Sequence, residues 1–250
     1  MIRRYRFSLA QDGGQPLPSF WAYRLYAWML EQVPRVYGQE LHMEGETPIS
    51  QSISFDRETQ QTVWTVQLLT DEMVSVFSPV LEGLDCIQLH GTELQACLLE
   101  ESETDGPRLL QRARQMEDQR RTKLCFATAT AFKSDGRYAI FPQEKWLLQS
   151  LAMKWNLICP AMPLDDADAF AALEKGLHIV DYSLRTVRYP LKNVKIPSFV
   201  GNIVVESRLP APLQEIWQLL VCLAPYTGVG IKTTLGMGSI AENSFSCWKN

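Results

Sequence analysis

Hydrophobic residues in the first hundred positions follow two different periods. Apolar and polar residues alternate over residues 3–9, as in a half-buried strand. Over residues 19–33 the apolar positions recur at helical spacing, and Pro34 ends that segment. The same two patterns continue with two strands, a helix and closing strands at 47–55, 61–69, 71–81 and 85–99. This half of the chain therefore has the element order β-α-β-β-α-β.

The second half repeats this plan after a polar, charged stretch at 101–121. A strand is expected at 123–128, followed by a hairpin that turns at Ser134-Asp135-Gly136. The remaining elements are three helices and three strands, at 142–155, 165–175, 212–223, 178–189, 199–206 and 237–242. We therefore expect an α+β fold of two tandem ferredoxin-like domains, each β-α-β-β-α-β, at residues 1–115 and 120–250.

The bulk composition excludes several classes of protein. No apolar run approaches the roughly 20 residues that a membrane-spanning helix needs. The basic N-terminus is not followed by the apolar region of a signal peptide. The 6 cysteines are scattered without a C-x-x-C pair, which predicts reduced core residues rather than disulfides or zinc ligands. We expect a cytoplasmic protein with no membrane association.

Charge along the chain is uneven, although the net charge is only −4. No acidic residue lies between Asp181 and Glu206, and four basic residues fall there: Arg185, Arg188, Lys192 and Lys195. A second basic group is diluted only by Glu117 and Asp118; its members are Arg108, Arg112, Arg114, Arg120, Arg121 and Lys123. Charge alone favours a solvated face for each group.

A glycine-rich segment at 228–238 follows the last predicted helix. Its glycines are Gly228, Gly230, Gly236 and Gly238, and between them lie Lys232, Thr233 and Thr234. Glycines let the backbone approach a ligand and form an anion-binding concavity, so this composition suits phosphate. A Walker A loop would need glycine where Ile231 stands, and a dinucleotide fingerprint would need a preceding strand. Two interpretations of the segment remain. It contacts phosphate without a nucleotide-binding domain, or it is only a tight connection between a helix and a strand.

The run from Ala224 to Gly238 resembles the C-terminal signature of the Cas-six family, the CRISPR precursor-RNA endoribonucleases of the RAMP superfamily. Upstream, Phe126 to Phe132 followed by Gly136, Pro142 and Leu151 to Asn156 resembles the family's strand–loop–helix entry to the second domain. Phe199 to Ile203 resembles its penultimate strand. The resemblance is specific over residues 124–240. It implies tandem ferredoxin-like domains and RNA cleavage that needs neither metal nor another cofactor.

In such a reaction the ribose 2′-OH attacks the neighbouring phosphate, leaving a 2′,3′-cyclic phosphate and a 5′-OH. The resemblance implies CRISPR repeat RNA in the precursor transcript as the partner, with a homodimer and other CRISPR effector subunits as further expected partners. We place the RNA-binding surface on the glycine-rich segment with Lys232 and on the basic stretch from Arg185 to Lys195. The alternative is a non-cleaving RAMP subunit that binds crRNA as a structural component of an effector complex.

The resemblance also selects catalytic candidates in the first domain. His42 stands on a Leu-His step before Gly45, where the family's general-base histidine is found. Tyr26, on the long helix, is the expected companion acid or phosphate donor, with Tyr23 one turn away as an alternative. The remaining histidines lie in or beside predicted strands, where histidine is more often structural: His90 and His178.

One family feature is missing. Several members carry a lysine shortly after the histidine, and this chain has none between Glu46 and Ser52. Arg24 or Arg35 is an alternative source of positive charge. Ser50 and Ser52 could instead hydrogen-bond the phosphate.

Overall fold

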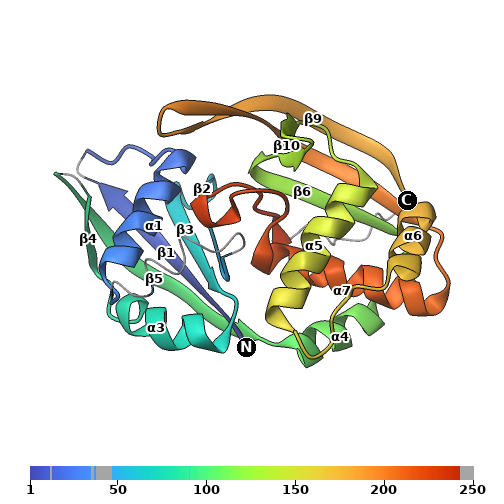
Figure 1. Cartoon of the computed structure of the whole chain (residues 1–250). Helices are drawn as coiled ribbons and strands as arrows, with labels where there is room; N and C mark the ends of the chain where they lie inside the picture. Colours follow the sequence, from blue (N-terminus) through green and yellow to red (C-terminus); the bar gives the residue numbers. More distant parts are fainter. Residues whose placement is uncertain (12, 35–36, 38–46, 90, 243–250) are drawn as a thin grey trace. The chain divides into compact units, whose positions relative to one another are not determined.

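The computed structural model describes residues 1–242 except 12, 35–36, 38–46 and 90. The chain folds into two compact parts (Figure 1). Unit 1 comprises Met1–Thr104 together with Lys232–Gly236, and unit 2 comprises Asp105–Ile231 and the residues from Met237 onward. The tip of the glycine-rich segment therefore belongs to the unit formed by the first hundred residues.

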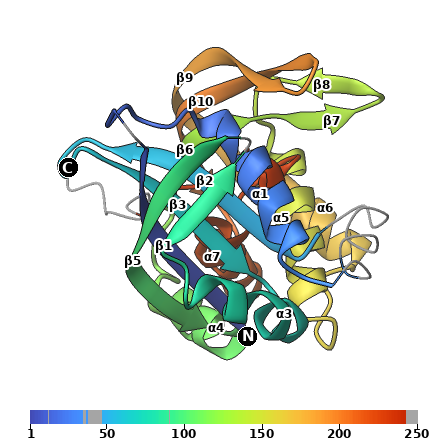
Figure 2. The same cartoon turned by 90° about the vertical axis from the view of Figure 1, so that its left-hand side faces the viewer.

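Unit 1 contains a five-stranded antiparallel sheet in the order β2-β3-β1-β5-β4. Its strands β1, β2, β3 and β5 are labelled in Figure 2. Its strands are β1 (Ile2–Gln11), β2 (Ile49–Asp56), β3 (Gln61–Leu68), β4 (Cys86–Leu89) and β5 (Thr92–Thr104). Its helices are the short η1 (Ser19–Trp21), α1 (Ala22–Glu31) and α3 (Asp71–Leu81), with η2 (Thr233–Leu235) added from the far end of the chain. The element order expected from the hydrophobic pattern is present.

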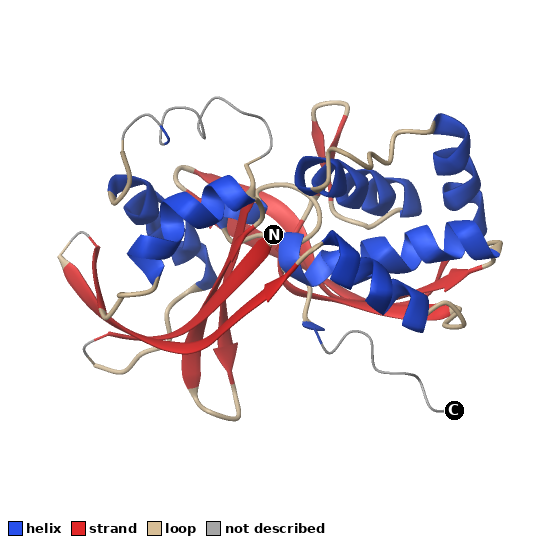
Figure 3. Ribbon diagram, turned by 90° about the horizontal axis from the view of Figure 1, so that it is seen from below, coloured by secondary structure: helices blue, strands red, loops and turns tan. Residues whose placement is uncertain are grey.

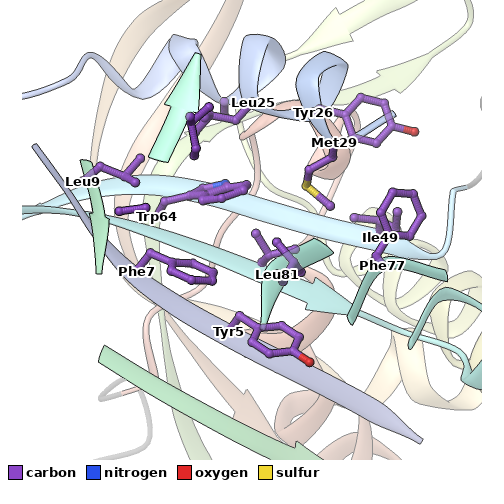
Figure 4. Close-up of a cluster of buried hydrophobic side chains, with 14 of the residues drawn as sticks. Tyr5, Phe7, Leu9, Leu25, Tyr26, Met29, Ile49, Trp64, Phe77 and Leu81 are labelled. Atoms are coloured by element: carbon purple, nitrogen blue, oxygen red, sulfur yellow. The ribbon is translucent and has the colours of Figure 1, made fainter. Parts of the chain in front are cut away.

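The core of unit 1 lies between one face of this sheet and the two helices. The alternate positions Tyr5, Phe7 and Leu9 of β1 are buried and pack with Leu25 and Met29 of α1 (Figure 4). Residues two apart share a face of a strand, and residues four apart share a face of a helix. The two periods in the sequence therefore meet in one apolar layer.

Unit 2 contains a three-stranded antiparallel sheet in the order β6-β10-β9 and a small β7–β8 hairpin. The strands are β6 (Arg121–Thr130), β7 (Phe132–Ser134), β8 (Arg137–Ala139), β9 (Leu177–Leu191) and β10 (Val194–Ser207). The helices are α4 (Gly106–Gln115), α5 (Glu144–Ile158), α6 (Ala167–Gly176) and α7 (Ala211–Thr227). Seen from below, these helices lie in front of the strands of the unit (Figure 3).

The expected last strand at 237–242 is reduced to a single bridge between Ile240 and Phe126. Backbone bonds from Ala127 N–H to the Ser239 carbonyl and from Ala241 N–H to the Cys125 carbonyl flank it. A regular strand cannot form upstream because Gly238 has φ +74°, outside the extended region.

The polar, charged stretch at 101–121, which the sequence analysis placed between the two halves, is the end of β5 followed by helix α4. Asp105 caps this helix by accepting the Arg108 N–H at 2.8 Å. Leu109 and Ala113, one turn apart, are its buried positions, and Pro107 stands in its first turn. Few apolar residues among several charges made the hydrophobic signal too weak to predict this helix, which belongs to unit 2.

The fold is α+β with antiparallel sheets, as the sequence predicted. Among the described residues, no helix combines the length and the apolar character that crossing a membrane requires.

Candidate functional site

The glycine-rich segment begins where α7 ends and has an irregular backbone. Gly228, Gly230, Gly236 and Gly238 all have positive φ, and so does Lys232, at +58°. At Gly230 a Cβ atom would lie 2.4 Å from the Ala131 carbonyl oxygen. Glycine is therefore required at this position both by conformation and by the closeness of the neighbouring backbone.

Hydrogen bonds within unit 2 hold the base of the segment. Val229 N–H donates to the Gly238 carbonyl at 2.8 Å, and Ile231 N–H donates to the Ala131 carbonyl at 3.0 Å. Gly230 N–H donates to the Ser150 hydroxyl at 2.8 Å. Because these N–H groups already have partners inside the protein, the segment offers a ligand mainly its tip. Lys232 is the exposed residue there, whereas Thr233 is buried and Thr234 is half-buried.

A buried lysine supports the start of the segment. Lys154 of α5 is 3% exposed, and its Nζ donates to the carbonyls of Thr227 and Gly228, each at 3.0 Å. These carbonyls lie at the C-terminus of α7, where the helix dipole favours a cation. Lys154 shares the buried face of α5 with Leu147 and Leu151. A lysine on an otherwise apolar helix face is a sequence signal from which the structural role of Lys154 could have been inferred.

The tip of the segment packs on unit 1. The short helix η2 contacts β2 and α1. Gln51 of β2 donates from Nε2 to the carbonyl of Thr234 at 2.7 Å and to that of Ala22, the first residue of α1, at 2.8 Å. The sequence analysis assigned Gln51 no role.

Helix α1 carries the tyrosine candidates. Tyr26 is 6% exposed and lies at the edge of the apolar core, with its hydroxyl pointing away from the labelled core residues (Figure 4). Burial raises the pKa of Tyr26, and a hydrogen bond with the Thr47 side chain partly opposes that shift. The hydroxyl therefore stays protonated near neutral pH, so Tyr26 is suited to donate a hydrogen bond. Tyr23, one turn earlier, is half-buried.

The basic stretch of the second half lies on the β9–β10 hairpin. All four of its basic side chains are exposed, and among the described residues none of them has an ion pair or a side-chain hydrogen bond: Arg185, Arg188, Lys192 and Lys195. Lys195 pairs with Pro190 in the sheet register, so it shares a face with Arg188, and Arg185 points to the other face. Lys192 stands in the connecting turn with φ +53°. The hairpin thus presents positive charge on both faces and at its end.

The second basic group is tied into unit 2. Arg112 donates to the Tyr226 hydroxyl at 2.9 Å, and Arg120 donates to the Leu209 carbonyl at 2.8 Å. Arg114 pairs with Glu215 at 2.7 Å, and Arg121 pairs with Glu206 at 3.0 Å. These arginines connect α4 and the start of β6 to α7 and β10.

Comparison with known proteins finds similarity to one family. Residues 124–240 match the family described as CRISPR-associated endoribonuclease Cas6, the same range in which the sequence resemblance was specific. A CRISPR-associated endoribonuclease Cas6 of Streptococcus thermophilus is 29% identical over 220 residues, which cover 88% of this chain and 90% of the relative. A protein of the same description from Mycobacterium tuberculosis is 25% identical over 86% of this chain and 69% of its own length. The chain matches the Cas6 family over residues 124–240.

Solved Cas6 structures share the fold. A Cas6 product complex superimposes with a TM-score of 0.78 at 24% identity, covering 96% of this chain and 98% of the other. Thermus thermophilus Cas6 superimposes with a TM-score of 0.75 at 21% identity, with coverage of 96% and 98%. The matched range 124–240 includes the glycine-rich segment. The base of this segment belongs to unit 2, and its tip, Lys232–Gly236, belongs to unit 1.

Several candidates for the Cas6 chemistry lie outside the described residues, namely His42, His90 and Arg35. Of the described candidates, Arg24 stacks its guanidinium over the Trp21 ring at 4.6 Å. Ser50 and Ser52 are buried on the face of β2 opposite Gln51. His178 is exposed near the start of β9.

Proposed function

We propose that this chain is a metal-independent endoribonuclease of the Cas6 family. It binds CRISPR repeat RNA and cleaves the precursor transcript into crRNA units by attack of the ribose 2′-OH, leaving a 2′,3′-cyclic phosphate and a 5′-OH. The observation that carries the proposal is the family match over 124–240 combined with the position of the segment tip, which packs on the helix that bears Tyr26.

We also propose that both units are ferredoxin-like. In unit 1 the strands lie in the order β2-β3-β1-β5, and the core lies between this sheet and the helices α1 and α3. In unit 2 the order β9-β10-β6 is extended by the bridge of Ile240 to Phe126, which stands in for the fourth strand. Each order interleaves strands from two β-α-β halves, which is the ferredoxin-like arrangement.

The proposed mechanism gives each candidate one task. His42 takes the proton from the 2′-OH, because an imidazole titrates near neutral pH. Tyr26, protonated at neutral pH, donates to the phosphate oxygen or to the leaving 5′-oxygen. Each positioned proton-transfer group typically contributes roughly 10²–10⁴-fold to the rate.

RNA contact is assigned to the exposed cations. Lys232 at the segment tip and the four basic residues of the β9–β10 hairpin have no protein side-chain partner within the described part of the chain, so their charges are free for phosphate. Similar solved structures include a Cas6 product complex and a Cas6 substrate mimic complex. Binding should weaken steeply with salt, because each phosphate contact releases counterions.

The test is incubation of the protein with repeat RNA from its own host in EDTA, followed by analysis of the product ends. Cyclic phosphate and 5′-OH ends are expected. In the same assay His42→Ala should lose roughly 10²–10⁴-fold in rate while RNA binding persists. The matched control is His178→Ala, which should cleave at the wild-type rate.

A second pair of variants tests the tyrosine. Tyr26→Phe removes only the hydroxyl and should slow cleavage by roughly 10²-fold. Tyr23→Phe, one turn away on α1, should leave the rate unchanged. If the two effects are reversed, the donor is Tyr23. Cleavage that stops in EDTA would refute metal independence.

The alternative function is a RAMP subunit that binds crRNA without cutting it. The observations that favour it are the missing lysine after His42 and the burial of Tyr26. Intact repeat RNA after incubation with wild-type protein, with and without EDTA, would establish this alternative, provided that tight binding is retained.

A further inference from the structure

Gln51 is a buried amide with an unusual set of partners. It is 1% exposed, and its two N–H groups donate to the Ala22 carbonyl at 2.8 Å and to the Thr234 carbonyl at 2.7 Å. Its oxygen accepts the indole N–H of Trp64 at 2.7 Å. A glutamine amide has two donors. Both are used here, and the Trp64 bond fixes which end of the amide is the oxygen.

The two carbonyls that Gln51 binds belong to the two parts of the proposed site. Ala22 is the first residue of α1 and lies one turn before Tyr26. Thr234 lies in η2, two residues after the exposed Lys232. All of these residues are in unit 1. One side chain therefore fixes both the helix that carries the proposed donor and the tip that is proposed to hold the RNA backbone.

Two neighbouring contacts do not join α1 to the tip. Lys154 holds the base of the segment through Thr227 and Gly228, in unit 2. Trp64 holds Gln51 from the neighbouring strand β3 but donates to neither carbonyl. Gln51 hydrogen-bonds to both α1 and the tip.

We propose that Gln51 is a positioning residue for cleavage, which sets the segment tip against α1 so that bound RNA is presented in register with the Tyr26 hydroxyl. This inference rests on the proposed endoribonuclease function. Gln51 touches neither RNA nor the reacting atoms. Its loss should therefore lower the rate of the bound complex more than the affinity, because displacement of about 1 Å in a reacting geometry can cost 10²-fold.

The decisive comparison is Gln51→Met against Gln218→Met. Methionine has similar length and volume but makes no amide hydrogen bond. Gln218 of α7 is likewise fully buried and donates from Nε2 to a backbone carbonyl, that of Gln119, at 2.8 Å. It lies in α7 of unit 2 and has no contact with the tip among its hydrogen bonds, so it controls for the loss of a buried amide.

Single-turnover cleavage is measured with protein above the dissociation constant, alongside RNA affinity and hydrogen exchange of residues 232–238. Gln51→Met should cleave about 10- to 100-fold more slowly, with affinity within about threefold of wild type and faster exchange at the tip. Gln218→Met should match wild type in all three. A second variant, Gln51→Asn, keeps the amide but is one methylene shorter, and should give a smaller loss in the same direction.

Four outcomes would count against the inference. If Gln51→Met cleaves as fast as Gln218→Met, Gln51 is structural and the proposed function stands. A loss of affinity that accounts for the whole loss of activity would make Gln51 part of RNA binding instead. If Gln51→Met does not fold, Gln51→Asn decides, and wild-type cleavage by that variant overturns the inference. Failure of the wild type itself to cleave would overturn the proposed function first, and the inference with it.

Discussion

Two basic regions of this chain look alike in sequence and differ in the structure. The first spans α4 and the start of β6, and the second is the β9–β10 hairpin. In the first, Arg112, Arg114, Arg120 and Arg121 each bond to a group on another element of unit 2. In the second, no described side chain pairs with any of the four cations.

The reason lies in what each region packs against. Helix α4 runs beside α7, which supplies Glu215 and Tyr226, and β6 pairs with β10, which supplies Glu206. The β9 strand is an edge strand of its sheet, and its partner β10 carries no acid opposite the four basic residues. Local charge density therefore cannot tell a structural arginine from one that is available to phosphate. The presence or absence of acidic residues on neighbouring elements determines which of the two an arginine is.

The largest expected effect is on the hairpin. Replacing Arg185, Arg188, Lys192 and Lys195 together by alanine should weaken repeat-RNA binding by roughly 10²- to 10³-fold at about 0.1 M salt. The slope of log affinity against log salt should become shallower by about three, since each contact contributes roughly 0.7 with single strands. Filter binding across a salt series measures both. Thermal stability should stay near that of wild type, because the side chains are exposed and unpaired.

The matched control removes four charges from the other region, at Arg108, Arg114, Arg120 and Arg121. Either variant changes the net charge from −4 to −8, because each loses four positive charges. The control should lower the unfolding temperature and leave the salt slope unchanged. Equal losses of RNA affinity in the two variants would show that net charge, not the hairpin, governs binding.

The next effect is at the segment tip. Lys232→Glu should weaken RNA binding roughly 10- to 100-fold, through loss of one phosphate contact and repulsion by the new carboxylate. Lys232→Asn removes the charge with a residue that tolerates positive φ, so it should cost less, about threefold to tenfold. Normal binding by Lys232→Glu would remove the tip from the RNA surface.

A smaller effect on stability, and none on RNA, is expected at Arg112. Arg112→Met loses the hydrogen bond to the Tyr226 hydroxyl and should lower the free energy of unfolding by about 0.5–1.5 kcal/mol. RNA affinity should stay within about twofold of wild type, because this side chain is not assigned to phosphate. Denaturant titration of Arg112→Met, Tyr226→Phe and the double variant isolates the pair. Additive losses would mean that the two groups do not interact.

The smallest effect is a pH dependence. Hydrogen bonds from Arg208 and then Arg121 lower the pKa of Glu206 below its ordinary value. Stability from this group is therefore present above the unfolded-state pKa and is lost as pH falls through the lower folded-state pKa. Wild type should exceed Glu206→Gln in denaturant midpoint at pH 7, and the gap should close below about pH 4. A gap that is constant down to pH 3 would contradict this.

Much of the fold was predictable because its signals are local. The strand and helix periods of residues 2–11 and 22–31 reflect one buried face each, and neighbouring side chains reveal that face without knowledge of what covers it. Helix α4 was missed because only Leu109 and Ala113 mark its buried face. The last strand was overpredicted because apolar residues at 237–240 are buried by contacts of an irregular backbone.

The candidate site was predictable only in part. Lys232 and the hairpin cations were found from composition, and Tyr26 from a resemblance, whereas His42 lies outside the described residues. Gln51 could not have been found from the sequence. Its bond to Thr234 spans 183 positions, and no pattern around residue 51 refers to the far end of the chain.

The sequence by itself determined most of the element order, the α+β class, the glycine-rich segment and the resemblance to the Cas6 family, because each depends on residue types at short spacing. Only the tertiary structure decided which unit holds the tip of that segment, which arginines are already paired, and which buried amide joins the tip to α1. These depend on contacts between residues far apart in the chain, and such contacts exist only once the sheets and helices have packed.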